Sequence, residues 1–209
     1  MYNGNKFNFI RLKQYRYALS IISGILCFLS FPPFSLHYLI WIALIPVLFS
    51  ILHAEDVDEV WKTGFIFGIT FYGLSLFWFY YIFGAFAVAL WCFITLFFAL
   101  AYFFHKKFGA TYFTLWLLPV LWVGIEFFRS ELLPWLKFGW MTLGYTQNLN
   151  LIILQFASLF GVYGISFLIV FINLCLVYII KKIKEKKLII GFLANIIIVL
   201  FIVLSVGAV

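Results

Sequence analysis

The sequence predicts an all-α integral membrane protein, a bundle of about seven transmembrane helices with an interfacial loop on its outer side. Of its 209 residues, 67% are hydrophobic and only 10% are charged, whereas an average soluble domain is about a quarter charged. The chain therefore has too little polar surface to cover a core in water. At roughly 20 apolar residues per crossing, its length accommodates six or seven helices. The net charge of +7 comes from short basic clusters between apolar runs, which excludes a nucleic-acid-binding face.

The first two helices are expected over residues 17–34 and 35–52. Four basic residues precede the first apolar run, as they would in a signal peptide. However, the run ends in Phe31-Pro32-Pro33-Phe34 and lacks the small residues of a cleavage site, so we expect an uncleaved helix followed by a tight turn. The second run follows at once, and the two helices should form a hairpin.

The third and fourth helices are expected over 61–83 and 84–104. The acidic stretch 53–59 precedes them and lacks the ligand spacing of a metal loop, so we interpret it as a solvated loop and expect no metal. Gly64 and Gly68 would let a neighbouring helix approach closely. The aromatic residues at 77–81 suit the headgroup boundary. His105, beside Lys106 and Lys107, is interpreted as a headgroup-facing loop residue.

The fifth helix is expected over 111–128, and an interfacial segment follows over 129–160. Glu126 and Arg129 are three residues apart and share a helical face near the end of this helix. A charge costs less at the membrane boundary than at its centre, so the pair belongs near the boundary. The segment after it is polar and is interrupted by proline and glycine. Amphipathic aromatic residues should hold it against the membrane surface, namely Trp135, Trp140 and Tyr145.

The last two helices are expected over 161–180 and 188–206. The apolar stretch 151–180 is about 30 residues long and would span roughly 45 Å as one helix, which overshoots the hydrocarbon core. We therefore divide it and place residues 148–160 in the interface or in a re-entrant segment. No internal repeat is visible, so residues 1–209 should form a single membrane domain.

The distribution of positive charge predicts the orientation. With a cytoplasmic N-terminus, twelve of the fourteen Lys and Arg residues lie on the inner side, and only Arg129 and Lys137 lie outside. This asymmetry satisfies the positive-inside rule for seven crossings. It places the C-terminus and the segment 129–150 on the outer side of the cytoplasmic membrane.

The sequence offers few groups for catalysis. It contains no Gly-rich phosphate loop, no G-x-S-x-G elbow and no H-E-x-x-H motif, and its three cysteines sit singly in apolar runs. An apolar environment leaves a thiol inert, so we assign no cysteine a catalytic role and expect no cofactor. Glu126 with Arg129 is the best ionisable pair. An interfacial salt bridge is the simpler interpretation, and a direct role in binding substrate is the alternative.

Several motifs together resemble the membrane portion of bacterial apolipoprotein N-acyltransferases. The central motif of that family, W-x-x-x-E-x-x-R…P-W…G-Y-x-Q, matches Trp122, Glu126-Phe127-Phe128-Arg129, Pro134-Trp135 and Gly144-Tyr145-Thr146-Gln147. Weaker matches flank it at 29–34, at 64–78, at Gln155 and at 161–167. The resemblance covers nearly the whole chain. It implies that Glu126, Arg129, Trp135, Tyr145 and Gln147 contribute to substrate binding.

The resemblance also implies an inner-membrane enzyme that moves an acyl chain from a phospholipid to the amino group of a lipoprotein's N-terminal cysteine. In that family a periplasmic nitrilase-like domain with a Glu-Lys-Cys triad performs the chemistry. The sequence ends at Val209, where that domain should start, so we expect a truncated or split enzyme that is inactive alone. A separately encoded nitrilase-like protein is a possible partner, and no residue present is assigned to the triad. Whether the chain is itself an enzyme stays open at this point.

A small transporter or binding subunit for a hydrophobic substrate is the main alternative. Transporters keep polar or broken-helix sites near the midplane. Here the amides deep in predicted crossings are Asn173 and Asn195, and a hydrogen bond between helices would explain each of them equally well.

Overall fold

The computed structural model is helical throughout the residues it describes, which confirms the all-α part of the predicted fold class. It describes residues 4–132, 138–184 and 190–207, and these ranges contain no strand. The longer helices are α1 (Gly4–Ser30), α3 (Ile45–Leu52), α4 (Val57–Ser75), α6 (Ala87–Phe108), α7 (Tyr112–Phe127), α8 (Leu151–Lys184) and α9 (Ile190–Gly207). The shorter elements are η1 (His37–Leu39), α2 (Ile40–Ala43), α5 (Phe79–Phe83), η2 (Gly84–Phe86), the π-helical turn η3 (Phe128–Leu132) and η4 (Leu143–Gln147).

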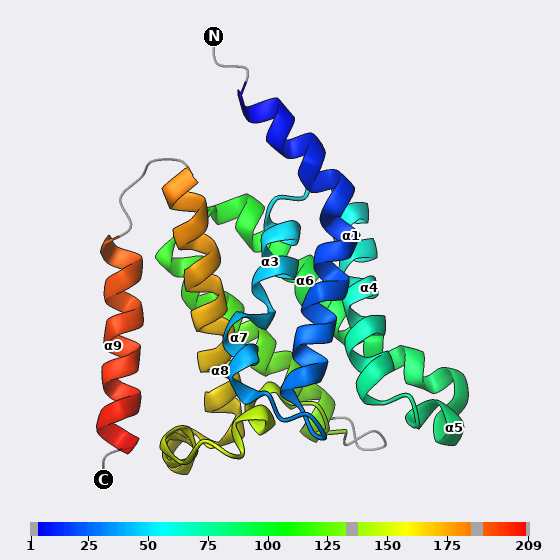
Figure 1. Cartoon of the computed structure of the whole chain (residues 1–209), viewed down its shortest axis with the longest axis vertical. Coiled ribbons are helices and arrows are strands. Elements are labelled where there is room, and N and C mark those ends of the chain that lie inside the picture. Colours follow the sequence, from blue (N-terminus) through cyan, green and yellow to red (C-terminus); the bar gives the residue numbers. More distant parts are fainter. Residues whose placement is uncertain (1–3, 133–137, 185–189, 208–209) are drawn as a thin grey trace.

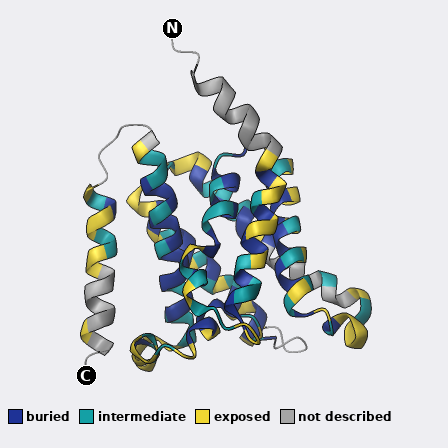
Figure 2. Ribbon diagram, in the orientation of Figure 1, coloured by how far each residue is buried: buried dark blue, intermediate teal, exposed yellow. Residues whose placement is uncertain are grey.

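The helices form one bundle with α3 near its centre. α1 packs along α4, α4 along α6, and α7 along α8, while α9 lies on the outer flank of α8 (Figure 1). α3 contacts α1, α4, α6 and α8. Burial follows this arrangement, because buried residues concentrate on the sides of the helices that face the centre (Figure 2). α1 begins at one end of the bundle, and α9 finishes at the other.

Two segments are long and apolar enough to cross a membrane, among the residues that the structure describes. They are Tyr112–Leu132 and Leu151–Ile183, the latter with a mean hydropathy of 2.4. The second contains a break at Gly161, whose φ of 65° and ψ of −173° are not helical. A positive φ is accessible to glycine without steric cost. The number of crossings, their bounds and the interfacial placement of 148–160 stay predictions.

The stretch 35–52 is broken into η1, α2 and α3 instead of one helix. The Asn173 side chain of α8 accepts a hydrogen bond from the Leu44 N–H at 3.0 Å and donates to the Ile40 carbonyl at 3.0 Å. The Ser23 hydroxyl of α1 accepts from the Val47 N–H, and Pro46 has no N–H to donate. Side chains from two other helices thus satisfy the backbone groups that a continuous helix would pair.

The two amides for which a hydrogen bond between helices is one explanation behave differently. Asn173 joins α8 to α2 and α3, as expected. For Asn195 the hydrogen bond that the structure describes lies within one helix, since its amide donates to the Gly191 carbonyl of α9 at 2.7 Å.

Replacing Asn173 with alanine should destabilise the fold by about 1–3 kcal/mol, since it strands the buried Leu44 N–H and Ile40 carbonyl. Asn195→Ala is the matched control, with a change below about 1 kcal/mol, because its bond lies within one helix. Denaturant unfolding of both purified variants in detergent measures the difference. Equal stability of the two variants would contradict this role of Asn173.

The charged groups at the end where α1 begins are more structured than expected. Asp56 caps α4 by accepting from the Glu59 N–H at 2.8 Å, so the helix begins at Val57 and not at 61. Arg16 forms a salt bridge with Glu59, which joins α1 to α4. The interpretation of 53–59 as only a solvated loop is therefore incomplete.

The prediction for His105 is wrong. This residue lies in the last turn of α6 with 5% of its surface exposed. Its Nε2 is 3.0 Å from the Lys181 Nζ, and its ring lies against Tyr178 of α8. A tertiary contact with α8, which local sequence cannot show, buries it.

Candidate functional site

Four of the five residues predicted for the site lie at the end of the bundle where α7 finishes. Glu126, Arg129 and Gln147 are buried, and Tyr145 is half exposed. The fifth, Trp135, lies outside the described residues. Residues 138–147 include Tyr145 and Gln147, and their backbone accepts or donates the hydrogen bonds of Glu126 and Arg129. We call this segment the site loop.

Glu126 holds the site loop through its backbone. Its Oε1 accepts hydrogen bonds from the Trp122 indole N–H at 2.9 Å and from the Leu143 N–H at 2.9 Å. Trp122 lies one turn earlier on α7, which fixes the carboxylate on its own helix. The carboxylate therefore joins the end of α7 to the start of η4.

Arg129 holds the same loop at a second point. Its Nη1 donates to the Trp140 carbonyl at 2.7 Å, and the Phe138 N–H donates to the Arg129 carbonyl at 3.2 Å. The guanidinium carbon lies 5.9 Å from the centre of the Tyr72 ring and 5.6 Å from that of Phe138. Aromatic faces attract such a cation.

The salt bridge considered for Glu126 and Arg129 is not present between these two described residues. Each side chain forms a hydrogen bond with the backbone of the site loop instead. Their i, i+3 spacing places them on one face, as predicted, but that face meets a loop whose N–H and carbonyl groups need partners. The pair acts as a two-point clamp.

Close packing against α8 completes the clamp. The Gly144 N–H donates to the Ser166 hydroxyl at 2.9 Å. A Cβ placed on Gly144 would lie 2.3 Å from the Val162 carbonyl oxygen, so only glycine fits this approach. Ser166 and Val162 belong to the flanking motif at 161–167, yet the sequence alone assigned neither to the site.

Gln147 ties the end of the site loop to the turn after α1. Its amide donates to the His37 carbonyl at 2.8 Å and to the Thr146 hydroxyl at 3.2 Å. The side chain is fully buried. The Gln147 side chain thus positions the site loop against η1.

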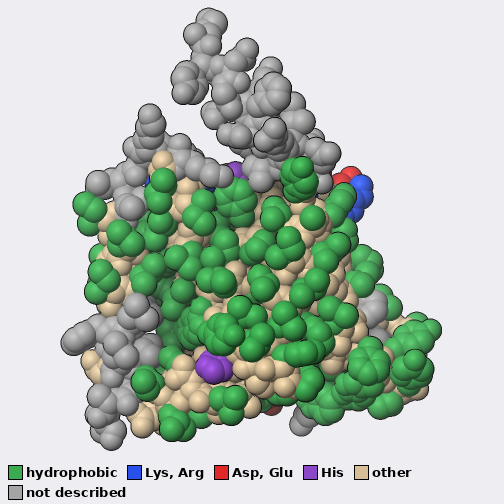
Figure 3. Space-filling model, in the orientation of Figure 1, with side chains coloured by type: hydrophobic (Ala, Val, Ile, Leu, Met, Phe, Trp, Pro, Cys, Tyr) green, Lys and Arg blue, Asp and Glu red, His purple; other side chains and the backbone are tan. Residues whose placement is uncertain are grey.

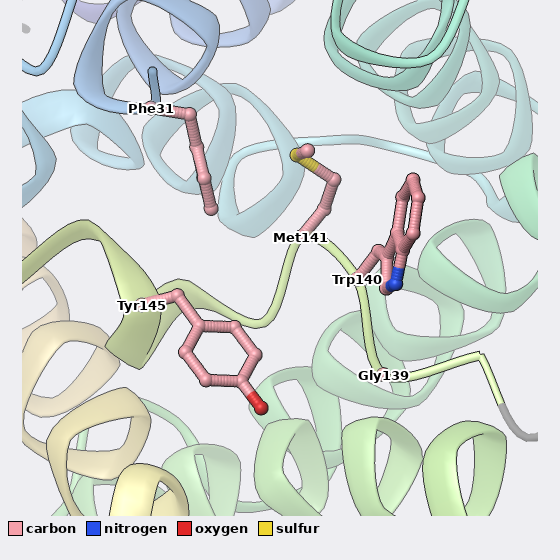
Figure 4. Close-up of a pocket in the computed structure, with 5 residues that line it drawn as sticks. All are labelled: Phe31, Gly139, Trp140, Met141 and Tyr145. Atoms are coloured by element: carbon pink, nitrogen blue, oxygen red, sulfur yellow. The ribbon is translucent and has the colours of Figure 1, made fainter. Parts of the chain in front are cut away.

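A pocket of about 510 Å³ opens beside the site loop. It is lined by Phe31, Gly139, Trp140, Met141 and Tyr145 (Figure 4). Phe31, at the end of α1, is far from the others in sequence, so sequence motifs do not reveal its part in the pocket. Met141 has a φ of 61°, which is uncommon for a residue with a side chain. Of the four predicted site residues that the structure describes, only Tyr145 lines this pocket directly.

The pocket offers hydrogen-bond donors beside an apolar wall. Tyr145 contributes a hydroxyl and Trp140 an indole N–H, and Phe31 and Met141 contribute apolar surface. The described cysteines, Cys27 and Cys175, are buried and do not line it. The described residues also hold no cluster of three metal-ligating side chains. This arrangement suits binding of an amphiphilic molecule.

Comparison with known proteins gives a consistent result. Residues 23–175 match the family model described as the apolipoprotein N-acyltransferase N-terminal domain. The chain is 31% identical over 183 residues to the apolipoprotein N-acyltransferase of Geobacter metallireducens, covering 82% of this chain and 34% of that protein. The enzyme of the same name from Coxiella burnetii is 32% identical over 186 residues, covering 81% and 38%. The chain spans about a third of the length of these relatives.

Proposed function

Because this chain belongs to the apolipoprotein N-acyltransferase N-terminal domain family, we propose that it is the membrane-embedded part of a lipoprotein N-acyltransferase. The reaction transfers an acyl chain from a phospholipid to the amino group of a lipoprotein's N-terminal cysteine. The observation that carries the proposal is the clamped site loop, in which Glu126, Arg129 and Gln147 of the family motif hold one wall of a pocket.

The membrane placement rests on where apolar and charged side chains lie. The face seen in Figure 3 is hydrophobic through its middle, and its Lys, Arg, Asp and Glu side chains gather mainly at the end where α1 begins. Apolar side chains are also exposed along several helices, among them Ile22, Phe103 and Val120. Lipid would solvate these groups better than water does. The charged end then faces the cytoplasm, and the site loop and the C-terminus face the periplasm of the inner membrane.

The chemistry requires groups beyond this membrane part. As the resemblance implies, a nitrilase-like domain supplies a Glu-Lys-Cys triad. A thiolate attacks the phospholipid ester carbonyl, the ester C–O bond breaks, and the lysophospholipid leaves as its alcohol after taking up a proton, so that the acyl chain is held as a thioester. The lipoprotein amine then attacks the thioester and loses a proton to a base, the C–S bond breaks, and the amide product and the thiolate are released. That domain belongs to the same polypeptide or is separately encoded. The membrane part alone should bind substrate and not transfer the acyl chain.

A chimera tests this function. The part of the Geobacter metallireducens enzyme that matches this chain is replaced by the chain, and the purified chimera is incubated with labelled phospholipid and a diacylated lipopeptide. We expect N-acylation by the chimera and none by the chain alone. The parent enzyme, assayed in parallel, is the positive control. A chimera that inserts into membranes and folds but stays inactive while the parent enzyme is active would overturn the proposal.

The transporter alternative gains no support from the structure. Both Asn173 and Asn195 donate to backbone carbonyls, and the Asn173 side-chain oxygen accepts from Leu44. Neither amide lines the pocket beside the site loop.

A further inference from the structure

We propose that residues 77–85, which we call the aromatic foot, lie in the headgroup region of the outer leaflet, and that this contact with the lipid surface fixes the depth of the site loop. The aromatic foot comprises α5, the turn before it and the start of η2, and it links α4 to α6. The inference rests on the membrane placement in the proposed function. It adds to that placement a lipid-contacting surface that lies against the site loop.

The first observation is the apolar surface that the aromatic foot exposes. Figure 1 shows α5 projecting sideways from the end of the bundle opposite the N-terminus, and the surface over this projection is hydrophobic in Figure 3. Most of its large side chains are exposed, and Tyr81 reaches 84%. The exposed residues are Phe77, Tyr80, Tyr81, Ile82 and Phe83. A contiguous exposed patch of this kind marks a surface that a membrane or another molecule covers.

The second observation is the lack of charge around this patch. The sequence between Lys62 and His105 contains no Asp, Glu, Lys or Arg. A surface that docks a soluble protein has a polar rim around its apolar centre, and the aromatic foot supplies no charged rim. Tyrosine and tryptophan rings, which have an apolar body and a polar end, are typical of the headgroup region of a bilayer. A lipid surface therefore fits the aromatic foot better than a soluble partner does.

The third observation is the distance between the aromatic foot and the charged end of the bundle. α4 begins after its Asp56 cap and has 19 residues, so at about 1.5 Å per residue it is roughly 28 Å long. α6 returns over 22 residues, roughly 33 Å, and ends with Lys106 and Lys107 in its last turn. The hydrocarbon core of a bilayer is about 30 Å thick. With the charged ends of both helices in the cytoplasmic headgroups, the aromatic foot reaches the headgroups of the outer leaflet.

The fourth observation is the contact between the aromatic foot and the site loop. The ring centre of Trp78 lies 4.9 Å from that of Trp140, and the ring centre of Phe79 lies 4.9 Å from that of Phe138. Arg129 holds the same two loop residues from the other side, through the Trp140 carbonyl and the Phe138 N–H. These contacts leave the site loop little freedom to move relative to the aromatic foot. The depth of the foot in the lipid therefore sets the depth of the loop.

Fluorescence quenching on the full chain tests the proposal in vesicles of phosphatidylethanolamine and phosphatidylglycerol. In a background with the native cysteines replaced, Tyr81→Cys, Val120→Cys and Asp58→Cys each carry one NBD fluorophore at an exposed position. The quenchers are iodide on both sides of the membrane, a lipid with a nitroxide on its headgroup, and a lipid with a nitroxide near the end of an acyl chain. Val120, in the middle of α7, and Asp58, in the first turn of α4, are the references for hydrocarbon and for water.

The Tyr81→Cys label should be quenched at least about twofold more by the headgroup nitroxide than by the acyl-chain nitroxide, as expected of an interfacial side chain. The Val120→Cys label should show the reverse order, and the Asp58→Cys label should respond mainly to iodide. A Tyr81→Cys label that behaves like either reference would overturn the proposal, because the aromatic foot would then stand in water or lie in hydrocarbon. Loss of lipid quenching at all three positions would instead refute the membrane placement on which the proposed function rests.

A second pair of variants tests the link between the aromatic foot and the site loop. With the label on Tyr145→Cys, Trp78→Ala removes the ring contact with Trp140 and should raise iodide quenching at least about twofold. Trp61→Ala truncates an exposed ring at the charged end of α4 and is the control, which should leave the quenching unchanged. Equal quenching in the two variants would show that the foot does not set the depth of the loop. An inactive chimera with both quenching patterns intact would sink only the proposed function.

Discussion

Replacing Glu126 with alanine should unfold the site loop and abolish acyl transfer by the chimera. The Trp122 indole N–H and the Leu143 N–H both donate to the same carboxylate oxygen and would be left without their acceptor. Each buried donor without a partner costs about 1–3 kcal/mol, so loss of the acceptor for two donors should cost the variant about 2–6 kcal/mol in stability. Denaturant unfolding in detergent, followed by the acylation assay on the chimera, measures both effects.

Two control variants separate this role from a general effect of charge. Glu126→Gln keeps an acceptor oxygen at the same position and should retain most of the stability. Glu131→Ala removes an exposed carboxylate from the neighbouring turn, which accepts one exposed hydrogen bond from the Tyr163 hydroxyl at 3.3 Å, and should change stability by less than about 0.5 kcal/mol. If Glu126→Ala proves as stable as Glu131→Ala, the carboxylate does not clamp the loop.

The second large effect is expected at Gly144. An alanine Cβ there would lie 2.3 Å from the Val162 carbonyl oxygen and 2.7 Å from its Cγ2. The carbonyl belongs to the backbone of α8 and cannot rotate away, so the site loop must separate from that helix. We expect a loss of about 1–3 kcal/mol or more from overpacking and a disrupted pocket.

Gly139→Ala is the matched control for Gly144→Ala. Its Cβ would meet the Ser130 hydroxyl at 3.5 Å, an ordinary contact, so the fold should keep its stability. Thermal unfolding of the two variants in detergent compares them directly. A Gly144→Ala protein with the melting temperature of Gly139→Ala would show that the loop does not pack against α8 as described.

Much of the fold and part of the site follow from local sequence. Apolar runs and scarce charge are enough to predict an all-α protein, because they reflect the average environment of each helix. The i, i+3 spacing of Glu126 and Arg129 places them on one face, and the family motif adds Gln147 and Tyr145. All four lie at the same end of the bundle.

The remaining features depend on contacts between distant residues. The break within 35–52 arises because Asn173 and Ser23 bond its backbone from other helices. The clamp partners of Glu126 and Arg129 are backbone groups, which have no sequence signature. Phe31 joins the pocket only because the end of α1 lies beside the site loop. Local patterns carry no information on such pairings.

The central claim, that the site loop and the charged end lie on opposite sides of the membrane, is tested by cysteine accessibility. In a background with the native cysteines replaced, Tyr145→Cys and Lys106→Cys place one thiol at each end, both at exposed positions. In intact spheroplasts a membrane-impermeant maleimide should label Tyr145→Cys at once and Lys106→Cys only after the membrane is permeabilised. Labelling of Lys106→Cys in intact spheroplasts, with Tyr145→Cys protected, would contradict the orientation and the placement of the site.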